Sequence, residues 1–365
     1  MYTVLIPLTE QGRPRMEEEC CWSRSGANTP GLALNLAAFL ARTGERVRLV
    51  YADRPPEPGS ATAMVFSWIF GDALEPLARE ADILVANPSS SAPVVQARFP
   101  HATVYPANLV FRETRDTPLP VHLLDPARHS RVLYQYASGC PWRCSFCVWA
   151  HAYTSRNARL CALDINRLVE LIPRVLDDPT GESCFLLGNE ITGKPRWLED
   201  FCNRLPDGLT WNADANIRNL AGRDILLAHA AGLRRLTLGV EFLENLTLAE
   251  LGKGHTVGEA FDAMAQLEYL GVRYRFSLRQ GIGETPEAMD ALLANLVTMH
   301  DCAQLHPDHV TIGPMAQWPG AEWPVGDNPL NLGTDRYPRL TPRLDPEIAA
   351  RWADVATLCA EYGWT

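Results

Sequence analysis

The stretch Ser138-Gly139-Cys140-Pro141-Trp142-Arg143-Cys144-Ser145-Phe146-Cys147 places three cysteines within eight residues, directly after the apolar run 132–137. An apolar, β-rich run that ends in Ser-Gly predicts a strand leading into a tight loop. Three thiolates this close together can face one centre, and soft sulfur ligands favour zinc, copper(I) or an iron–sulfur cluster. A four-iron cluster held by three cysteines would keep one iron open, whereas structural zinc usually takes a fourth protein ligand.

The spacing of Cys140, Cys144 and Cys147, with the aromatic Phe146 just before the third cysteine, resembles the signature of the radical S-adenosylmethionine (SAM) enzymes. The resemblance implies a 4Fe-4S cluster on these three cysteines, with SAM bound to the open iron. An electron from the cluster would cleave SAM and release a 5′-deoxyadenosyl radical. The alternative is a non-enzymatic zinc module of the Cys3His type, with His151 as the fourth ligand.

Size and composition limit the possible functions. The length of 365 residues predicts about two domains, and 47% hydrophobic with 21% charged residues is typical of a globular chain. A net charge of −10, with the acidic residues spread along the chain, disfavours a nucleic-acid partner. The sequence shows no apolar run near the roughly 18 residues of a membrane helix and no signal peptide, so we expect a cytoplasmic protein with no membrane partner.

Residues 1–125 predict an α/β domain with a doubly wound parallel sheet, because expected strands alternate with helices. The expected strands are 3–8, 46–52, 81–87 and 101–105, and the expected helices are 31–42 and 72–80. Such sheets bind ligands beyond the carboxyl ends of their strands, here near residues 7–9, 53 and 88–91. Residues 112–130 contain three prolines and read as a linker.

The segments 28–34 and 44–50 look like part of the cobalamin-binding domain that precedes the barrel in one large branch of the radical SAM enzymes. The resemblance implies a Rossmann-like domain that is truncated here after its fourth strand. Two alternatives stay open: the domain binds cobalamin, or it is a degenerate domain kept for packing or substrate contact.

Residues 126–320 predict six strand–helix units, which right-handed crossovers arrange as a partial (β/α)6 barrel with its chemistry at the strand carboxyl ends. The radical SAM family uses this architecture. The expected strands are 132–137, 184–187, 209–213, 235–240, 272–278 and 310–313. The expected helices are 164–176, 195–205, 222–231, 257–270 and 286–300. Residues 321–365 predict a C-terminal cover segment and a final helix that begins at Asp345. Two alternatives stay open for Trp318 and Trp323: they line a substrate pocket, or they take part in ordinary packing of the tail.

Three of these strand ends carry residues that resemble family motifs. Gly188-Asn189-Glu190 is similar to the Gly-Gly-Glu motif that binds the amino group of SAM. Gly239-Val240-Glu241 with the later Lys253-Gly254-His255-Thr256 looks like the pattern around the fourth strand, and 279–287 resembles the turn that lies near the adenine. Because the three pieces occur in order at strand ends, they favour the cluster over zinc. The candidate cofactor-binding residues are Phe146, Gly188, Asn189, Glu190, Asn212, Glu241, Arg279, Gly281 and Gly283.

Other polar residues of the barrel are weaker candidates. Arg218, Arg275 and Arg279 are candidates for the methionine carboxylate, although each has a simple salt bridge as its alternative. Asn212, Asp214 and Asn216 alternate along one strand and therefore share a face, where cofactor or substrate contact is expected. The five dispersed cysteines are expected to be small core residues: Cys161, Cys184, Cys202, Cys302 and Cys359.

The resemblance therefore implies a radical SAM enzyme whose cofactors are a 4Fe-4S cluster, SAM and, if the first domain binds it, cobalamin. The expected reaction is methylation of an unactivated carbon in a natural-product or peptide substrate, with an external flavodoxin- or ferredoxin-like electron donor. Without cobalamin, the expected reaction is a radical rearrangement, epimerisation or oxidation.

Overall fold

The computed structural model describes residues 1–6, 31–51, 58–67, 71–87, 91–114, 116–117, 119–123, 133–135, 137–140, 142, 144–147, 160–162, 184–187, 195–205, 207–220, 222–315, 329–331, 340–342 and 344–364. The chain divides into two compact units. The first contains Met1–Gly139, His151–Leu187 and Gly333–Pro338, and the second contains Cys140–Ala150, Gly188–Leu332 and Arg339–Thr365.

The first unit contains a five-stranded sheet in the order β2-β1-β3-β4-β5, in which every neighbouring pair is parallel. Its strands are β1 (Tyr2–Ile6), β2 (Val47–Tyr51), β3 (Ala61–Ser67), β4 (Ile83–Asn87) and β5 (Thr103–Pro106). The side chains of Val4, Ile6 and Val85 are fully buried, and they form one core with the apolar face of the first helix. This architecture confirms the expected doubly wound α/β domain.

The central strand β3 is the main correction to the sequence interpretation, which predicted four strands in this domain and did not include this one. Ala63, Met64 and Phe66 on this strand are fully buried. A strand buried on both faces is apolar without alternation, so it lacks the period-two signal by which a strand is recognised. The sheet therefore has five strands, and β3 lies between β1 and β4.

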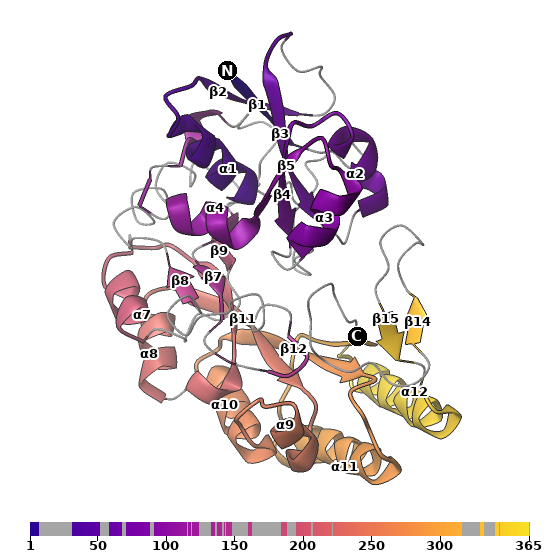
Figure 1. Ribbon diagram of the computed structural model, residues 1–365. Coiled ribbons are helices and arrows are strands. Elements are labelled where there is room, and N and C mark those ends of the chain that lie inside the picture. The colour runs from indigo at the N-terminus through magenta and orange to yellow at the C-terminus, as the bar shows by residue number, and fades with distance from the viewer. Residues whose placement is uncertain are drawn as a thin grey trace. The chain divides into compact units, whose positions relative to one another are not determined.

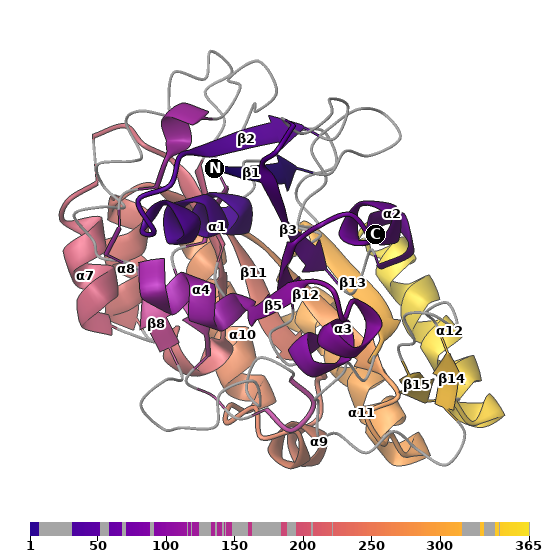
Figure 2. The same ribbon diagram turned by 45° about the horizontal axis from the view of Figure 1, so that its top comes forward.

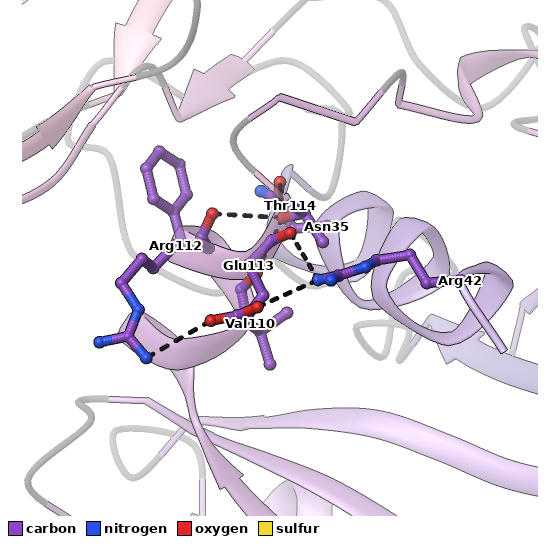
Figure 3. Close-up of polar contacts among 7 residues, drawn as sticks. Asn35, Arg42, Val110, Arg112, Glu113 and Thr114 are labelled. Carbon is purple, nitrogen blue, oxygen red and sulfur yellow. Dashed lines mark hydrogen bonds and ion pairs between the residues drawn. The ribbon is translucent and has the colours of Figure 1, made fainter.

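Among the described residues, four helices accompany this sheet: α1 (Gly31–Ala41), α2 (Gly71–Ala78), α3 (Ala92–Arg98) and α4 (Ala107–Thr114). Helices α1 and α4 pack against each other (Figure 1), and α4 occupies the start of the stretch 112–130 that was predicted to be a linker. The buried hydroxyl of Thr114 lies 3.1 Å from Oδ1 of Asn35 (Figure 3). Arg42 directly follows α1. Its guanidinium donates hydrogen bonds to the backbone carbonyl oxygen of Glu113 at 2.7 Å and to the Glu113 carboxylate at 3.2 Å.

A second, six-stranded sheet has the order β13-β12-β11-β10-β9-β6, which confirms the expected series of six barrel strands. Its strands are β6 (Leu133–Gln135), β9 (Cys184–Leu187), β10 (Trp211–Ala215), β11 (Leu233–Glu241), β12 (Arg273–Gln280) and β13 (His309–Pro314). The pairings β6–β9, β10–β11, β11–β12 and β12–β13 are parallel. Two short antiparallel pairs are β7 (Ala137–Gly139) with β8 (Leu160–Ala162) and β14 (Pro329–Asn331) with β15 (Leu340–Pro342).

The helices of the second unit are α7 (Pro195–Cys202), α8 (Gly222–Ala230), α9 (Asn245–Glu250), α10 (Val257–Tyr269), α11 (Pro286–Val297) and α12 (Pro346–Glu361). Helix α8 contacts β11, and helix α10 contacts β12. On β11 the buried Leu236, Leu238 and Val240 share one face of the strand, while Thr237 and Glu241 share the other. The sheet therefore has an apolar face and a face that carries polar side chains.

The C-terminal helix α12 packs along α11, as Figure 2 shows in yellow and orange. Ile348, Trp352, Val355 and Cys359 are buried, as the helical spacing predicted. Cys202 is buried too, but Cys302 is exposed, which corrects its assignment as a core residue. It lies at the end of the short π-helical segment Thr298–Cys302, which directly follows α11.

Several predictions lie outside the described residues, among them the helix 164–176, the zinc candidate His151, and Trp318 and Trp323. Within the described part of the chain, every helix is too short or too polar to span a membrane.

Candidate functional site

The predicted site residues fall into two groups. Gly188, Asn189 and Glu190 lie outside the described residues, as do residues 7–9, 53 and 88–90, near which a ligand of the first domain was expected. The described candidates are the three cysteines with Phe146, Asn212, Glu241, Arg279, Gly281 and Gly283. They come from the cysteine loop, from the start of β10 (Asn212), and from the carboxyl-terminal parts of β11 and β12 and the turn that follows β12.

The cysteine loop is tied to the turn after α9. The amide of Ser145 donates to the carbonyl oxygen of Leu251 at 3.0 Å, and the amide of Cys147 donates back to the carbonyl of Cys144 at 3.1 Å. The second bond closes a tight turn between the second and third cysteines. The thiol of Cys144 is buried, and those of Cys140 and Cys147 are partly exposed.

A second contact holds the tryptophan of this loop. The guanidinium carbon of Arg218 lies 4.6 Å from the centre of the Trp142 ring, within the range of a cation–π interaction. The same guanidinium lies against Gly254, where an added Cβ would come within 2.6 Å of Nη1. Gly254 has a φ of 67°, so glycine meets both a conformational and a steric requirement at this position.

Lys253 is the buried cation of the site, with a relative exposure of 4%. Its Nζ lies 3.4 Å from Oε1 of Glu241 and 5.9 Å from the centre of the Phe146 ring. Burial alone would lower the pKa of Lys253, but the negative charges of Glu241, Cys144 and Cys147 raise it above its ordinary value. The ammonium is therefore charged, and it acts on two of the three candidate sulfur ligands.

Glu241 joins three neighbouring side chains at the end of β11. Its Oε2 accepts hydrogen bonds from the hydroxyl of Ser277 at 3.1 Å and from Nε of Arg279 at 3.2 Å. Burial would raise the pKa of Glu241, but Lys253, Arg279 and Ser277 together lower it. Glu241 has a left-handed φ of 68°, and the register of β11 against β12 shifts between Leu238 and Glu241. A left-handed non-glycine residue is uncommon, and such residues cluster at functional sites.

The turn after β12 is held by Glu284. Its carboxylate accepts hydrogen bonds from the amides of Gly281 at 2.7 Å and Ile282 at 2.9 Å. The indole of Trp352 donates to the same carboxylate at 3.0 Å, so helix α12 supports this turn. Gly281 and Gly283 have positive φ values of 79° and 94°, a backbone conformation that glycine adopts at no steric cost.

A polar row crosses the sheet one layer below Glu241. Asp214, Thr237 and Arg275 are direct neighbours on β10, β11 and β12. Nε of Arg275 donates to the Thr237 hydroxyl at 3.1 Å, and Thr237 hydrogen-bonds to Asp214. Burial raises the pKa of Asp214 to about 6, against the opposing effects of Thr237 and Arg275. Arg275 therefore belongs to this row, while Asn216 caps the following 3-10 turn by accepting from the amide of Arg218.

The donor set of the cysteine loop fits an iron–sulfur cluster chemically. It supplies three sulfurs, of which two act on the same buried ammonium, and a positive charge favours thiolates over thiols. Within the described residues, no group of three His, Cys, Asp or Glu side chains is gathered closely enough to hold a metal ion.

Sequence reasoning did not assign roles to Lys253, Trp142 or Ser277. A signal was present for Lys253, because this chain almost always uses arginine for its cations. Trp142 and Ser277 gave no comparable signal, since their partners Arg218 and Glu241 are distant in sequence.

Comparison with solved structures identifies the architecture. The structure of OxsB, a cobalamin-dependent SAM radical enzyme with aqua-cobalamin and SAM bound, matches 99% of this chain and 67% of its own, with a TM-score of 0.69 and 12% identity. The fold is that of the cobalamin-dependent radical SAM enzymes. The radical SAM methyltransferase TsrM from Kitasatospora setae, with tryptophan substrate and a SAM analogue bound, matches over 98% of this chain and 88% of its own, with a TM-score of 0.69 and 13% identity.

A second TsrM structure, with cobalamin and a [4Fe-4S] cluster bound, shares the radical SAM fold with this chain at a TM-score of 0.67 and 14% identity, over 98% of this chain and 90% of its own. No family model and no curated protein matches the sequence. At this level of identity, the radical SAM likeness establishes the architecture: a Rossmann-like unit together with the strands of a partial barrel.

Proposed function

We propose that this protein is a radical SAM enzyme that carries a 4Fe-4S cluster on Cys140, Cys144 and Cys147. The observation that carries the proposal is the tie between the cysteine loop and the turn after α9 through Ser145 and Leu251. Leu251 lies two residues before Lys253, which pairs with Glu241 at the carboxyl end of β11 and whose charge acts on Cys144 and Cys147. Active sites of barrels with parallel strands lie at this end of the strands.

The chain's own residues suit the amino-acid part of SAM. Glu241 offers a carboxylate to an ammonium, and Arg279 offers a guanidinium, 36% exposed, that matches a carboxylate in geometry. Arg279 and Glu241 contact each other at 3.2 Å. A ligand that carries both an ammonium and a carboxylate can replace this contact by pairing its ammonium with Glu241 and its carboxylate with Arg279. Glu284 shapes the glycine turn where the adenine is expected. When bound, the cluster would supply the electron that cleaves SAM.

The reaction class proposed is cobalamin-dependent methylation of an unactivated carbon in a small natural product or peptide. The support is the likeness of the whole chain to OxsB and TsrM, which includes the five-stranded parallel sheet of the first unit. Without cobalamin, a radical rearrangement, epimerisation or oxidation would take its place. The electron donor is proposed to be an external flavodoxin- or ferredoxin-like protein, and the location cytoplasmic.

The test is anaerobic reconstitution with iron and sulfide, followed by metal analysis and incubation with dithionite and SAM. We expect about four iron atoms and four sulfides per chain, together with release of 5′-deoxyadenosine. One zinc and no iron would instead support the zinc module. Gel filtration after incubation with hydroxocobalamin, with a spectrum of the protein peak, decides between the two reaction classes.

The matched pair of variants is Cys144→Ala and Cys302→Ala, which remove one thiol each. Cys144→Ala should lose most of the iron and all SAM cleavage, because a three-thiolate set has no spare ligand. Cys302 is exposed in the π-helical segment, so its variant should keep both. A Cys144→Ala protein with its full iron content would contradict the cluster assignment.

A further inference from the structure

The choice of lysine at position 253 is unusual for this chain. Of its 33 Lys and Arg residues, only Lys194 and Lys253 are lysines. Lysine differs from arginine in carrying a compact point charge, without the planar fork that suits paired hydrogen bonds. Lys253 therefore places a compact, buried cation in a chain that uses arginine almost everywhere else.

The backbone fixes where this cation lies. The amide of Lys253 donates to the carbonyl of Leu248 at 3.0 Å, at the end of α9. Gly252 and Gly254 on either side both have a φ of 67°, so Lys253 lies within a tight turn. Two residues earlier, Leu251 accepts the hydrogen bond from Ser145. The ammonium and the cysteine loop are therefore held by one short segment.

The surroundings of the ammonium favour a strong effect on the sulfurs. It is 4% exposed, so water screens it poorly, and its charge acts on both Cys144 and Cys147. Phe146 presents its ring 5.9 Å away rather than a polar group. The neighbouring His255 is buried, which lowers its pKa to about 4, so that it is neutral and adds no charge of its own.

Glu241 provides the opposing charge. Its Oε1 lies 3.4 Å from Nζ, and Gly239 leaves the space between them, because an added Cβ would lie 3.2 Å from Nζ and 3.4 Å from Oε1. Glu241 is in turn held by Ser277 and Arg279. The negative charge of Glu241 therefore partly offsets the effect of the Lys253 charge on the sulfurs.

We propose that Lys253 is a positioning residue that raises the reduction potential of the cluster held by Cys140, Cys144 and Cys147, and that Glu241 limits this effect. Reduction adds one electron, taken from a low-potential external donor, to a cluster ligated by thiolates. A fixed buried cation stabilises the more negative, reduced form, and charge and solvent exposure are among the factors that set such potentials. The inference rests on the proposed function, since it requires the cluster.

The experiment is a redox titration of the reconstituted full-length protein without SAM, with the reduced cluster measured by electron paramagnetic resonance. Lys253→Met keeps the length and apolar contact of the side chain but removes the charge. We expect the ratio of reduced to oxidised cluster at a fixed potential to fall about tenfold, which is about 59 mV for one electron. Lys253→Arg keeps the charge and should shift the potential less.

Glu241→Gln gives the decisive contrast, because it removes the offsetting negative charge and should move the potential upward. A purely structural role of the pair would not produce shifts of opposite sign. Arg273→Met is the control for loss of one positive charge. Arg273 lies at the amino end of β12, and its side chain is 54% exposed. In the Arg273→Met variant, the ratio of reduced to oxidised cluster should change less than twofold.

The outcomes separate the two proposals. A wild-type protein that assembles no iron–sulfur cluster overturns the proposed function and this inference with it. A wild-type cluster whose potential is unchanged in Lys253→Met, or shifts in the same direction in Lys253→Met and Glu241→Gln, overturns the inference alone. If Lys253→Met binds no iron, Glu241→Gln decides, and anything other than an upward shift contradicts the inference.

Discussion

The backbone amide of Ser145 donates a hydrogen bond to the carbonyl oxygen of Leu251, 3.0 Å away and 106 residues further along the chain. This bond joins the cysteine loop to the turn that carries Lys253. Because both partners are backbone atoms, the contact does not depend on either side chain. It makes the position of the cysteines a property of the fold of the second unit.

Substitution of Ser145 by proline should therefore disturb the cysteine loop. Proline has no amide hydrogen, so the carbonyl of Leu251 loses its donor, at a cost of about 1–3 kcal/mol. We expect reduced iron loading and a lower midpoint in urea unfolding. Ser145→Ala keeps the amide and loses only the weak hydroxyl contact at 3.4 Å, so it should resemble the wild type. Equal iron loading in both variants would show that the backbone bond is dispensable.

Gly254→Ala should destabilise the protein more than Gly271→Ala. Both glycines have nearly the same φ, 67° and 69°, so both variants meet the left-handed penalty of about 1–2 kcal/mol. Only at Gly254 does the new Cβ meet another group, at 2.6 Å from Nη1 of Arg218. The difference between their free energies of unfolding in urea measures the displacement of Arg218. A Gly271→Ala protein that is the less stable of the two would contradict this account.

Glu284→Ala should weaken the SAM binding that we propose. The variant removes the acceptor for two turn amides and for the Trp352 indole, and a turn with unpaired amides adopts its bound geometry less often. We expect the Kd for SAM, measured by isothermal titration with the reconstituted protein, to rise about tenfold, which corresponds to about 1.4 kcal/mol. Glu361→Ala, on the exposed end of α12, is the control and should leave the Kd unchanged.

Asp214 should make the stability of the protein fall as pH rises from about 4 to 7. The pKa of Asp214 is higher in the folded state than in the unfolded state. Its contribution to the free energy of unfolding is therefore fully present below the unfolded-state pKa and is lost as the pH rises through the folded-state pKa. The difference between 3.8 and about 6 corresponds to about 3 kcal/mol. Asp214→Asn removes this dependence, so its free energy of unfolding relative to wild type should increase with pH. A difference that is constant between pH 4 and 7 would contradict the raised pKa.

Much of the architecture could be predicted from the sequence, because it depends on local patterns. The spacing of the three cysteines, the caps and apolar faces of helices such as α10 and α12, and the alternation of strands with helices are all visible in short windows. They predicted the parallel sheet of β1 to β5 and the strands of the six-stranded sheet. The pattern failed at β3, whose burial on both faces removes the alternation.

The sequence by itself determined that three sulfurs share one loop and that strands and helices alternate around it, since both follow from residue type and spacing. Only the tertiary structure decided which distant side chains meet that loop. Lys253 lies near Cys144 and Cys147, Arg218 lies over Trp142, and Glu241 lies between Lys253 and Arg279. The physical reason is that these contacts depend on the register of neighbouring parallel strands and on the turns that follow them. Strand register is set by packing across the whole sheet, and no local pattern encodes it.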